Sequence, residues 1–187
     1  MAANHGIFIP RQIGAMNVDI WNRHAISGST VGDVDNGSVF TLTGKSTEVD
    51  EFEVWTTALT SASPTADVLW MAYSGEEFMP SLQPATTADD VKEFTNLEGK
   101  VFPAYRPQVH DLITLNADAI LSAFADGDLY LIPVAGQKKL DWSAADPGTG
   151  LCYKLIQTTT IAFGSTSLNS SFGSGRETAY IFECIRA

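Results

Sequence analysis

The sequence predicts an all-β or β-rich fold, a small sandwich or barrel of short strands with long loops and an extended N-terminal arm. Three observations lead to this prediction. Short alternating or wholly apolar runs recur along the chain, turn-forming Gly, Pro, Asn and Asp residues separate them, and few segments carry a helical period. Hydrophobic residues make up 44% of the 187 residues, which is enough to bury a core without disulfide support.

The predicted domain division places an extended arm at residues 1–37 and the β-rich domain at residues 38–187. Glycines and a proline interrupt the first segment, and only Val18–Trp21 is typical of a strand there. Chain ends of this kind stay poorly ordered unless something ties them down, so we expect the arm to lie on a partner surface. The residues predicted to contact that partner are Ile7, Phe8, Ile9, Trp21 and Arg23.

Within the domain, period-two alternation and short apolar runs indicate the strands. The alternation is clearest around Phe52–Thr56, and Val68–Tyr73 is apolar throughout. The other predicted strands lie at Val39–Leu42, around Val101, at Leu112–Leu115, at Leu129–Pro133, and within 151–163 and 178–187.

Between the strands, the sequence predicts turns and at most one or two short helices. A helix capped by Thr87 is expected, with Asp89 and Asp90 in its first turn. Ala119–Phe124 is expected to form a short helix or a strand. Asp126-Gly127 between apolar runs is typical of a hairpin turn, and a further turn is expected at Arg106–Asp111.

Charge and hydropathy exclude several partner classes. The chain carries 22 acidic and 11 basic residues, a net charge of -11, and its longest basic cluster is Lys138-Lys139. Nucleic-acid binding requires a basic surface, so we expect no nucleic-acid partner, whereas a basic patch on a protein partner would fit. No apolar run approaches the ~20 residues of a membrane span, and the N-terminus lacks the apolar stretch of a signal peptide. We therefore expect no membrane association and production in the cytoplasm of the producing cell.

Two features invite a metal or disulfide interpretation. Asp33 and Asp35 suggest a calcium loop, but the sixth residue from Asp33 is Ser38 and the twelfth is Gly44, where an EF-hand needs Gly and Glu. A turn at Asn36-Gly37 is the favoured interpretation, with an irregular cation site left open. Cys152 and Cys184 are expected to be buried thiols in strands, with a single disulfide as the alternative.

Sequence signatures of catalysis do not occur in the chain. It has no G-x-S-x-G, S-x-x-K, G-x-G-x-x-G or P-loop pattern, and none of its three histidines has a patterned nucleophile. We expect a protein that is not an enzyme and that has no cofactor and no metal. The remaining catalytic hypothesis is a small hydrolase that uses His110 with Asp111.

Two segments together resemble a known family. The first, "DVDNGSVFTLTG", begins at Asp33, and the second, "NLEGKVFPAYRPQVHDLITL", begins at Asn96. In order and spacing they resemble the head decoration, or second major head, proteins of tailed bacteriophages, over roughly residues 30–135. The matching residues are Asp33, Asp35, Asn36, Gly37, Leu42, Gly44, Gly99, Lys100, Tyr105 and Asp111. The departures are Phe102, Pro103, Pro107, His110 and Ile113.

The resemblance implies a capsid-associated virion protein without catalytic residues. The leading hypothesis is therefore a structural protein that decorates or cements the capsid surface of a bacteriophage head assembled in the host cytoplasm. Its expected partners are the major capsid protein and its own copies, with a trimer favoured. The alternative is a carbohydrate- or receptor-binding β module of a virion, in which exposed Trp55 and Trp142 would stack on sugars.

Overall fold

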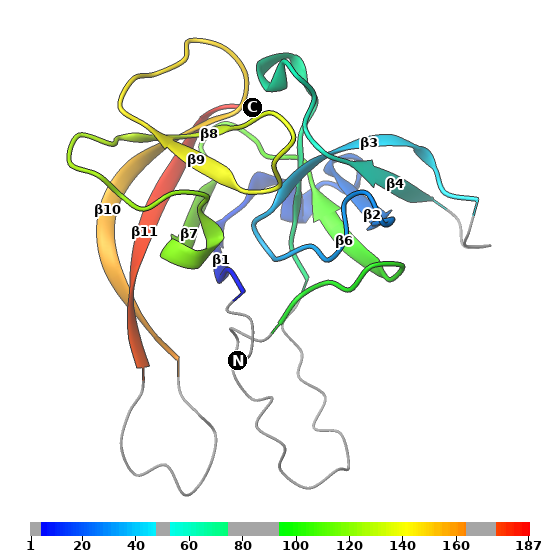
Figure 1. Cartoon of the computed structure of the whole chain (residues 1–187), viewed down its shortest axis with the longest axis horizontal. Helices are drawn as coiled ribbons and strands as arrows, with labels where there is room; N and C mark the ends of the chain where they lie inside the picture. Colours follow the sequence, from blue (N-terminus) through cyan, green and yellow to red (C-terminus); the bar gives the residue numbers. More distant parts are fainter. Residues whose placement is uncertain (1–4, 48–52, 75–93, 164–174) are drawn as a thin grey trace, which may run out of the picture.

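The computed structural model describes residues 5–47, 53–74, 94–163 and 175–187. Strands hold 47% of these residues, short 3-10 turns hold 8%, and there is no α-helix among them. The strands form an open sheet and a closed five-stranded barrel side by side (Figure 1). The β-rich prediction is therefore confirmed, in a form that combines a barrel with a sheet.

The open sheet has six strands, and all of its pairings are antiparallel. Its two longest strands, β10 and β11, lie at the centre, next to each other in both sequence and space. In sheet order the strands are β1 (Phe8–Gln12), β7 (Leu112–Asn116), β11 (Gly175–Arg186), β10 (Cys152–Phe163), β8 (Tyr130–Pro133) and β9 (Leu140–Ser143).

The barrel closes because its first strand pairs on both sides, in parallel with β4 and antiparallel with β6. In barrel order the strands are β2 (Asn22–Ile26), β4 (Val54–Ala58), β3 (Val39–Lys45), β5 (Trp70–Ala72) and β6 (Val101–Tyr105). The 3-10 turns are η1 (Gly14–Asn17), η2 (Asp19–Trp21), η3 (Pro64–Ala66) and η5 (Ala117–Ala119).

Two apolar clusters fill the molecule, and the alternation of side chains along the barrel strands supplies both. In β5, Trp70 and Ala72 belong to the cluster of the barrel, whereas Met71 belongs to the larger cluster of the sheet. On β3, Phe40 belongs to the cluster of the barrel and Val39 to the cluster of the sheet. Successive residues of a strand point to opposite faces, so a strand that is buried on both faces must be apolar throughout. This explains the uninterrupted apolar run of β5.

The N-terminal segment is built into both sheets. β1 pairs with β7 from Phe8 to Gln12, and β2 closes the barrel. The predicted strand at Val18–Trp21 is wrong: η2 occupies Asp19–Trp21, and the Asn22 side chain donates to the carbonyl oxygens of Ala15 and Val18. These hydrogen bonds favour a tight turn over an extended strand. Residues 8–26 thus contribute strands to the fold rather than a separate arm.

The turn predictions have mixed outcomes. Asp126-Gly127 forms a turn, in which Gly127 adopts φ +99° and the N–H of Asp128 donates to the carbonyl of Ala125. Residues 121–125, which precede the turn, form no strand, so this turn does not join two strands of a hairpin. The hairpin joins β8 to β9 instead, through residues 134–139. The turn before β7 is present. The helix expected at Thr87 and the start of the alternation at Phe52 lie outside the described residues. In the part of the chain that the structure describes, no helix is long and apolar enough to cross a membrane.

Candidate functional site

The segment Asp33–Gly37 forms a tight turn at the junction of the barrel and the sheet. The backbone N–H of Ser38 donates to the carbonyl of Asp35 at 3.1 Å, and Gly37 adopts φ +82°. Only glycine adopts this conformation without strain, and a side chain here would meet Leu115 and Phe8. The predicted turn is confirmed.

Asn36 anchors this turn to the rest of the barrel. Its side chain is buried and exchanges two hydrogen bonds with the backbone of Ser74, at 2.8 and 3.0 Å. The Asn96 amide donates to Asn36 Oδ1 at 3.3 Å and to the carbonyl of Val34 at 2.8 Å. A buried amide is tolerated only when its polar atoms are paired, so these contacts fix the position of the turn.

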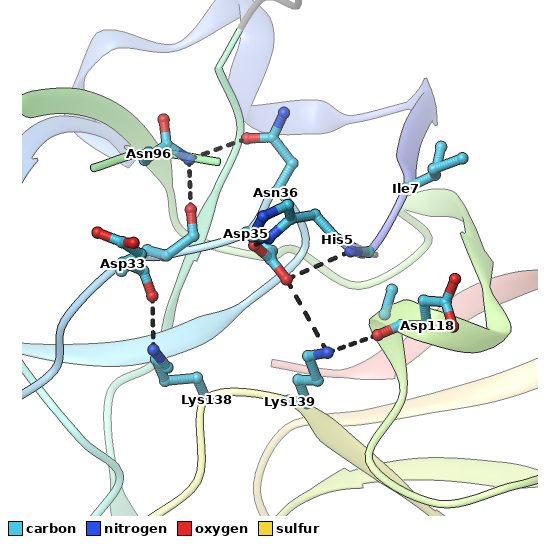
Figure 2. A network of polar contacts seen from close by, with 12 residues as sticks. His5, Ile7, Asp33, Asp35, Asn36, Asn96, Asp118, Lys138 and Lys139 are labelled. Carbon is cyan, nitrogen blue, oxygen red and sulfur yellow. Dashed lines mark hydrogen bonds and ion pairs between the residues drawn. The ribbon is translucent and has the colours of Figure 1, made fainter. Parts of the chain in front are cut away.

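Asp35 links the N-terminal segment to the sheet, as Figure 2 shows. Its carboxylate accepts hydrogen bonds from His5 Nδ1 at 2.7 Å and from the Gly6 N–H at 3.2 Å. Lys139 Nζ lies 3.9 Å from Asp35 and donates to the carbonyl of Asp118 at 2.6 Å. One carboxylate therefore connects three separate segments of the chain.

The loop between β8 and β9 closes the junction from the side of the sheet. Lys138 Nζ donates to the carbonyl oxygens of Val31 and Asp33, at 2.7 and 2.5 Å (Figure 2). Its own carbonyl accepts from the N–H of Val39 on β3 at 2.7 Å. Thr60 Oγ1 donates to the carbonyl of Val134 at 2.5 Å. The only basic pair of the sequence thus fastens the barrel to the sheet.

The cation site left open by the sequence finds no support in this geometry. Asp33 Oδ1 accepts from the N–H of Glu98 at 2.8 Å, while the carboxylate of Asp35 faces His5. Within the described residues, no three His, Cys, Asp or Glu side chains cluster closely enough to hold a metal ion. Both carboxylates act as acceptors for protein donors.

Asn116 forms a second buried polar link, which sequence reasoning did not find. Its Oδ1 accepts from the backbone N–H groups of Ile7 at 2.8 Å and Ala119 at 3.1 Å. Its Nδ2 donates to Glu177 Oε2 at 3.1 Å. The side chain is fully buried. The only sequence signal is an asparagine that directly follows an apolar strand, which is too common to be diagnostic.

The predicted interface residues of the N-terminal segment divide into core and surface positions. Ile7 and Phe8 are 3% and 4% exposed, and Phe8 packs beside the ring of Tyr105. Both are buried within this chain: Phe8 lies on the face of β1 that packs on the core, and Ile7 is buried just before the strand begins. Ile9 is 38% exposed. Of the three, only Ile9 presents a large apolar surface to solvent.

Trp21 and Arg23, the other predicted interface residues, are half-buried beside the barrel. The guanidinium of Arg23 lies 5.9 Å from the ring centroid of Trp55 and 5.7 Å from that of Trp70. These distances are typical of cation–π contacts. A shallow hollow beside Arg23 is lined by side chains of both charges, including Asp19 and Glu53. Arg23 thus packs on the barrel's own tryptophans.

The hydrolase hypothesis requires His110 and Asp111 to act together, but in the structure the two side chains have different hydrogen-bond partners. The His110 ring is exposed and bonds Glu183 Oε1 at 2.8 Å. Asp111 is 2% exposed, and its carboxylate accepts from the N–H groups of Gly14 and Gln108, both at 2.7 Å. Burial raises the pKa of Asp111, and these two hydrogen bonds oppose the rise. Asp111 thus fastens the N-terminal segment to the turn before β7.

The two cysteines are free and fully buried, on neighbouring strands. This confirms the expectation of buried thiols and not the alternative of a disulfide. Burial raises the pKa of Cys152 to about 11 and that of Cys184 to about 12, where nearby Asp111 adds to the rise. The thiolate is the reactive form of cysteine, so both groups are inert near neutral pH.

The tryptophans that the carbohydrate hypothesis needs are half-buried. Trp142 lies in an aromatic cluster, with ring centroids 5.1 Å from Phe124, 5.1 Å from Tyr180 and 5.4 Å from Phe182. Phe124 is 39% exposed, so one side of this cluster reaches the surface. Trp55 is also partly exposed and carries the Arg23 contact.

The long hairpin β10–β11 extends beyond the strands that flank it. Figure 1 shows these two strands continuing past the ends of β7 and β8. β8 pairs with β10 only at Tyr153 and Lys154, and β7 pairs with β11 only from Ala179 to Glu183. We call residues 156–163 and 175–178 the distal ribbon. The sequence predicted strands here but not that their ends would stand free of the sheet.

No family model, no curated protein and no solved structure matches this chain.

Proposed function

We propose that this chain is a structural virion protein of a tailed bacteriophage. It decorates or cements the outside of the capsid through contacts with the major capsid protein and with its own copies. It acts by binding and not by catalysis. The trimer expected from the sequence remains a prediction.

The roles of the matched residues support this proposal. Asp33, Asp35, Asn36 and Gly37 all serve the turn that joins the barrel, the sheet and the N-terminal segment. Asp111 of the second matched segment holds the backbone of Gly14. The residues that carry the resemblance therefore maintain a fold, which suits a family of structural proteins.

The observation that carries the proposal is the distal ribbon. An isolated two-stranded hairpin is only marginally stable in water. A free edge strand also presents unpaired N–H and C=O groups to any neighbouring strand. A protein that works alone gains nothing from such an edge, whereas a protein that repeats on a lattice gains a contact at every copy. Many weak contacts of this kind add up to tight attachment.

Binding to empty heads tests the proposal. Purified protein should bind expanded, undecorated heads built from the major capsid protein of the same phage, and cryo-EM should place it in repeated positions on the outer surface. Heads of an unrelated phage are the control. A protein that does not cosediment with its own heads, or that binds both kinds equally, contradicts the proposal.

A pair of variants tests the predicted contact at Ile9. Ile9→Asp should reduce the occupancy of the heads, because it places a charge in an apolar contact. Val68→Asp is the matched control, since Val68 is 54% exposed on the barrel and lies outside the predicted interface. Equal occupancy for the two variants would remove Ile9 from the interface.

One observation favours the alternative, a carbohydrate-binding β module. Phe124 and Trp142 together offer a partly exposed aromatic surface of the kind on which sugar rings stack. A glycan array distinguishes the two functions. Specific binding to one class of glycan, lost in Phe124→Ala, would favour the alternative over capsid decoration.

A further inference from the structure

The distal ribbon has a long and regular free edge. Beyond a bulge between Leu155 and Gln157, β10 pairs with β11 without interruption, from Gln157 opposite Ile181 to Phe163 opposite Gly175. Among the described strands, none pairs with the other side of β10 in this range. Seven consecutive residues therefore form an uninterrupted edge whose outer side pairs with no described strand.

This edge lacks the usual safeguards against pairing with another strand. Natural edge strands are protected by charged side chains, especially lysine, by proline, by bulges or by short length. Residues 155–163 contain no charged residue, no proline and no glycine, and five of the nine are β-branched. The single bulge lies at the start of the ribbon. Ile156 is 52% exposed, and Thr158 and Thr160 are exposed as well.

Charge identifies the partner. A net charge of -11 makes two copies repel each other wherever acidic surfaces meet. Residues 157–163 of β10 carry no charged side chain, whereas the neighbouring strand carries Arg176 and Glu177. Two copies can therefore approach along β10 without charge repulsion. A basic partner would instead be attracted to acidic surface elsewhere on the chain.

We propose that Gln157–Phe163 of β10 pairs antiparallel with the same segment of a second copy. The two six-stranded sheets then join into one continuous sheet across a two-fold axis. This register is centred on Thr160, so it places Thr160 opposite Thr160 of the second copy and Thr159 opposite Ile161, and cross-strand pairs of threonine and of β-branched residues are favourable. This inference rests on the proposed function, because it names the surface through which copies of the decorating protein meet.

Two double variants with the same change in charge test the contact. Thr158→Lys with Thr160→Lys places positive charges along the edge, where they would face the same charges of the second copy. Thr43→Lys with Thr47→Lys is the control, because both threonines are exposed on or next to β3 of the barrel. Sedimentation equilibrium should show self-association of the wild-type protein and of the control. The ribbon variant should dissociate with a constant raised by roughly tenfold or more, since each tenfold corresponds to only about 1.4 kcal/mol.

Hydrogen exchange of the wild-type protein gives a readout that needs no variant. Amides of residues 157–163 should become more protected as the protein concentration rises, while amides of the barrel should not change. A wild-type protein that stays monomeric at all concentrations overturns the inference. It is equally overturned by a purely trimeric protein, or by a ribbon variant that associates as tightly as the control.

The failures of the two proposals are distinguishable. A monomer that binds phage heads overturns the ribbon contact and leaves the proposed function in place. A protein that associates through the ribbon but does not bind heads retains the contact and overturns the proposed function.

Discussion

At the scale of single residues, the polar side chains of the matched segments support the fold. Asp35, Asn36 and Asp111 each accept backbone N–H groups from segments far away in sequence. A buried acceptor that is removed leaves its donors unsatisfied, at about 1–3 kcal/mol each. These polar side chains therefore contribute to the stability of the fold.

The buried cysteines make the stability of the protein depend on pH. Burial raises their pKa values from 9.0 to about 11 for Cys152 and about 12 for Cys184. Between pH 9 and those values the unfolded chain loses these protons while the folded chain keeps them. The stabilisation is therefore complete below about pH 9 and is lost as the pH rises. We expect the free energy of unfolding to fall by about 2–4 kcal/mol by about pH 10.5 from the two thiols together.

The double variant Cys152→Ala with Cys184→Ala isolates this effect. Urea unfolding at several values of pH should show a shallower decline for the variant than for the wild-type protein. Buried Tyr105 and Tyr153 also have raised pKa values, but they are present in both proteins and cancel in the difference. Parallel curves for the two proteins would show that the thiols do not titrate as expected.

At the scale of elements, the sequence and the structure differ most at β1. Its five residues include Pro10, which weakens the strand signal in the sequence. Among the described strands β1 pairs only with β7, at the edge of the sheet, so it tolerates the missing N–H of Pro10. Deleting residues 1–30 would remove both β1 and β2. Such a truncation would disrupt both the sheet and the barrel.

Phe8 and Ile9 test whether β1 belongs to the folded domain. Phe8→Ala should lower the free energy of unfolding by about 3–5 kcal/mol, because it removes a buried ring from the core. Ile9→Ala should cost less, about 1 kcal/mol, because Ile9 is 38% exposed and Phe8 only 4%. Urea denaturation followed by tryptophan fluorescence measures both values. Small and equal effects would mean that β1 is not docked on β7.

At the scale of the whole molecule, the barrel and the sheet share a core. The larger apolar cluster contains Val39, Met71 and Tyr105 from the barrel together with Leu115 and Phe182 from the sheet. Tyr105 also donates to Met71 Sδ within the cluster. Since neither unit can expose this surface without cost, we expect a single cooperative unfolding transition.

Substitution of Gly150, which lies against η3, tests this packing. A side chain at Gly150 would lie 2.5 Å from Thr65 Cα, whereas one at Gly148 meets nothing within 4 Å. Both glycines have positive φ, +73° and +77°, so an alanine at either position costs about 1–2 kcal/mol for the backbone. Gly150→Ala should cost about 1–3 kcal/mol more than Gly148→Ala, because only the first forces the loop away from the barrel.

Thermal unfolding of the two glycine variants gives this comparison. We expect both to retain one transition, with the lower midpoint for Gly150→Ala. Equal midpoints would mean that the loop is free to move away from η3. Two separate transitions in the wild-type protein would mean that the barrel and the sheet unfold independently.

The sequence by itself determined the β-rich class, most strand positions, the turn at Asn36-Gly37 and the buried state of both cysteines. These properties follow from local patterns: side chains alternate along a strand, glycine permits positive φ, and apolar runs need cover. The sequence could not reveal that Lys138 and Lys139 fasten the barrel to the sheet, because their acceptors lie up to 107 residues away. It missed the pairing of His5 with Asp35 for the same reason.

Only the tertiary structure decided which strands pair and which edges stay free. Ile7 and Phe8 are as apolar as Ile9, yet the position of β7 buries the first two and leaves the third exposed. The threonines of β10 suit a central strand as well as an edge, and their exposure depends on where β8 ends. Strand pairing joins segments across long distances in the chain, so a local pattern predicts the strand but not its neighbours.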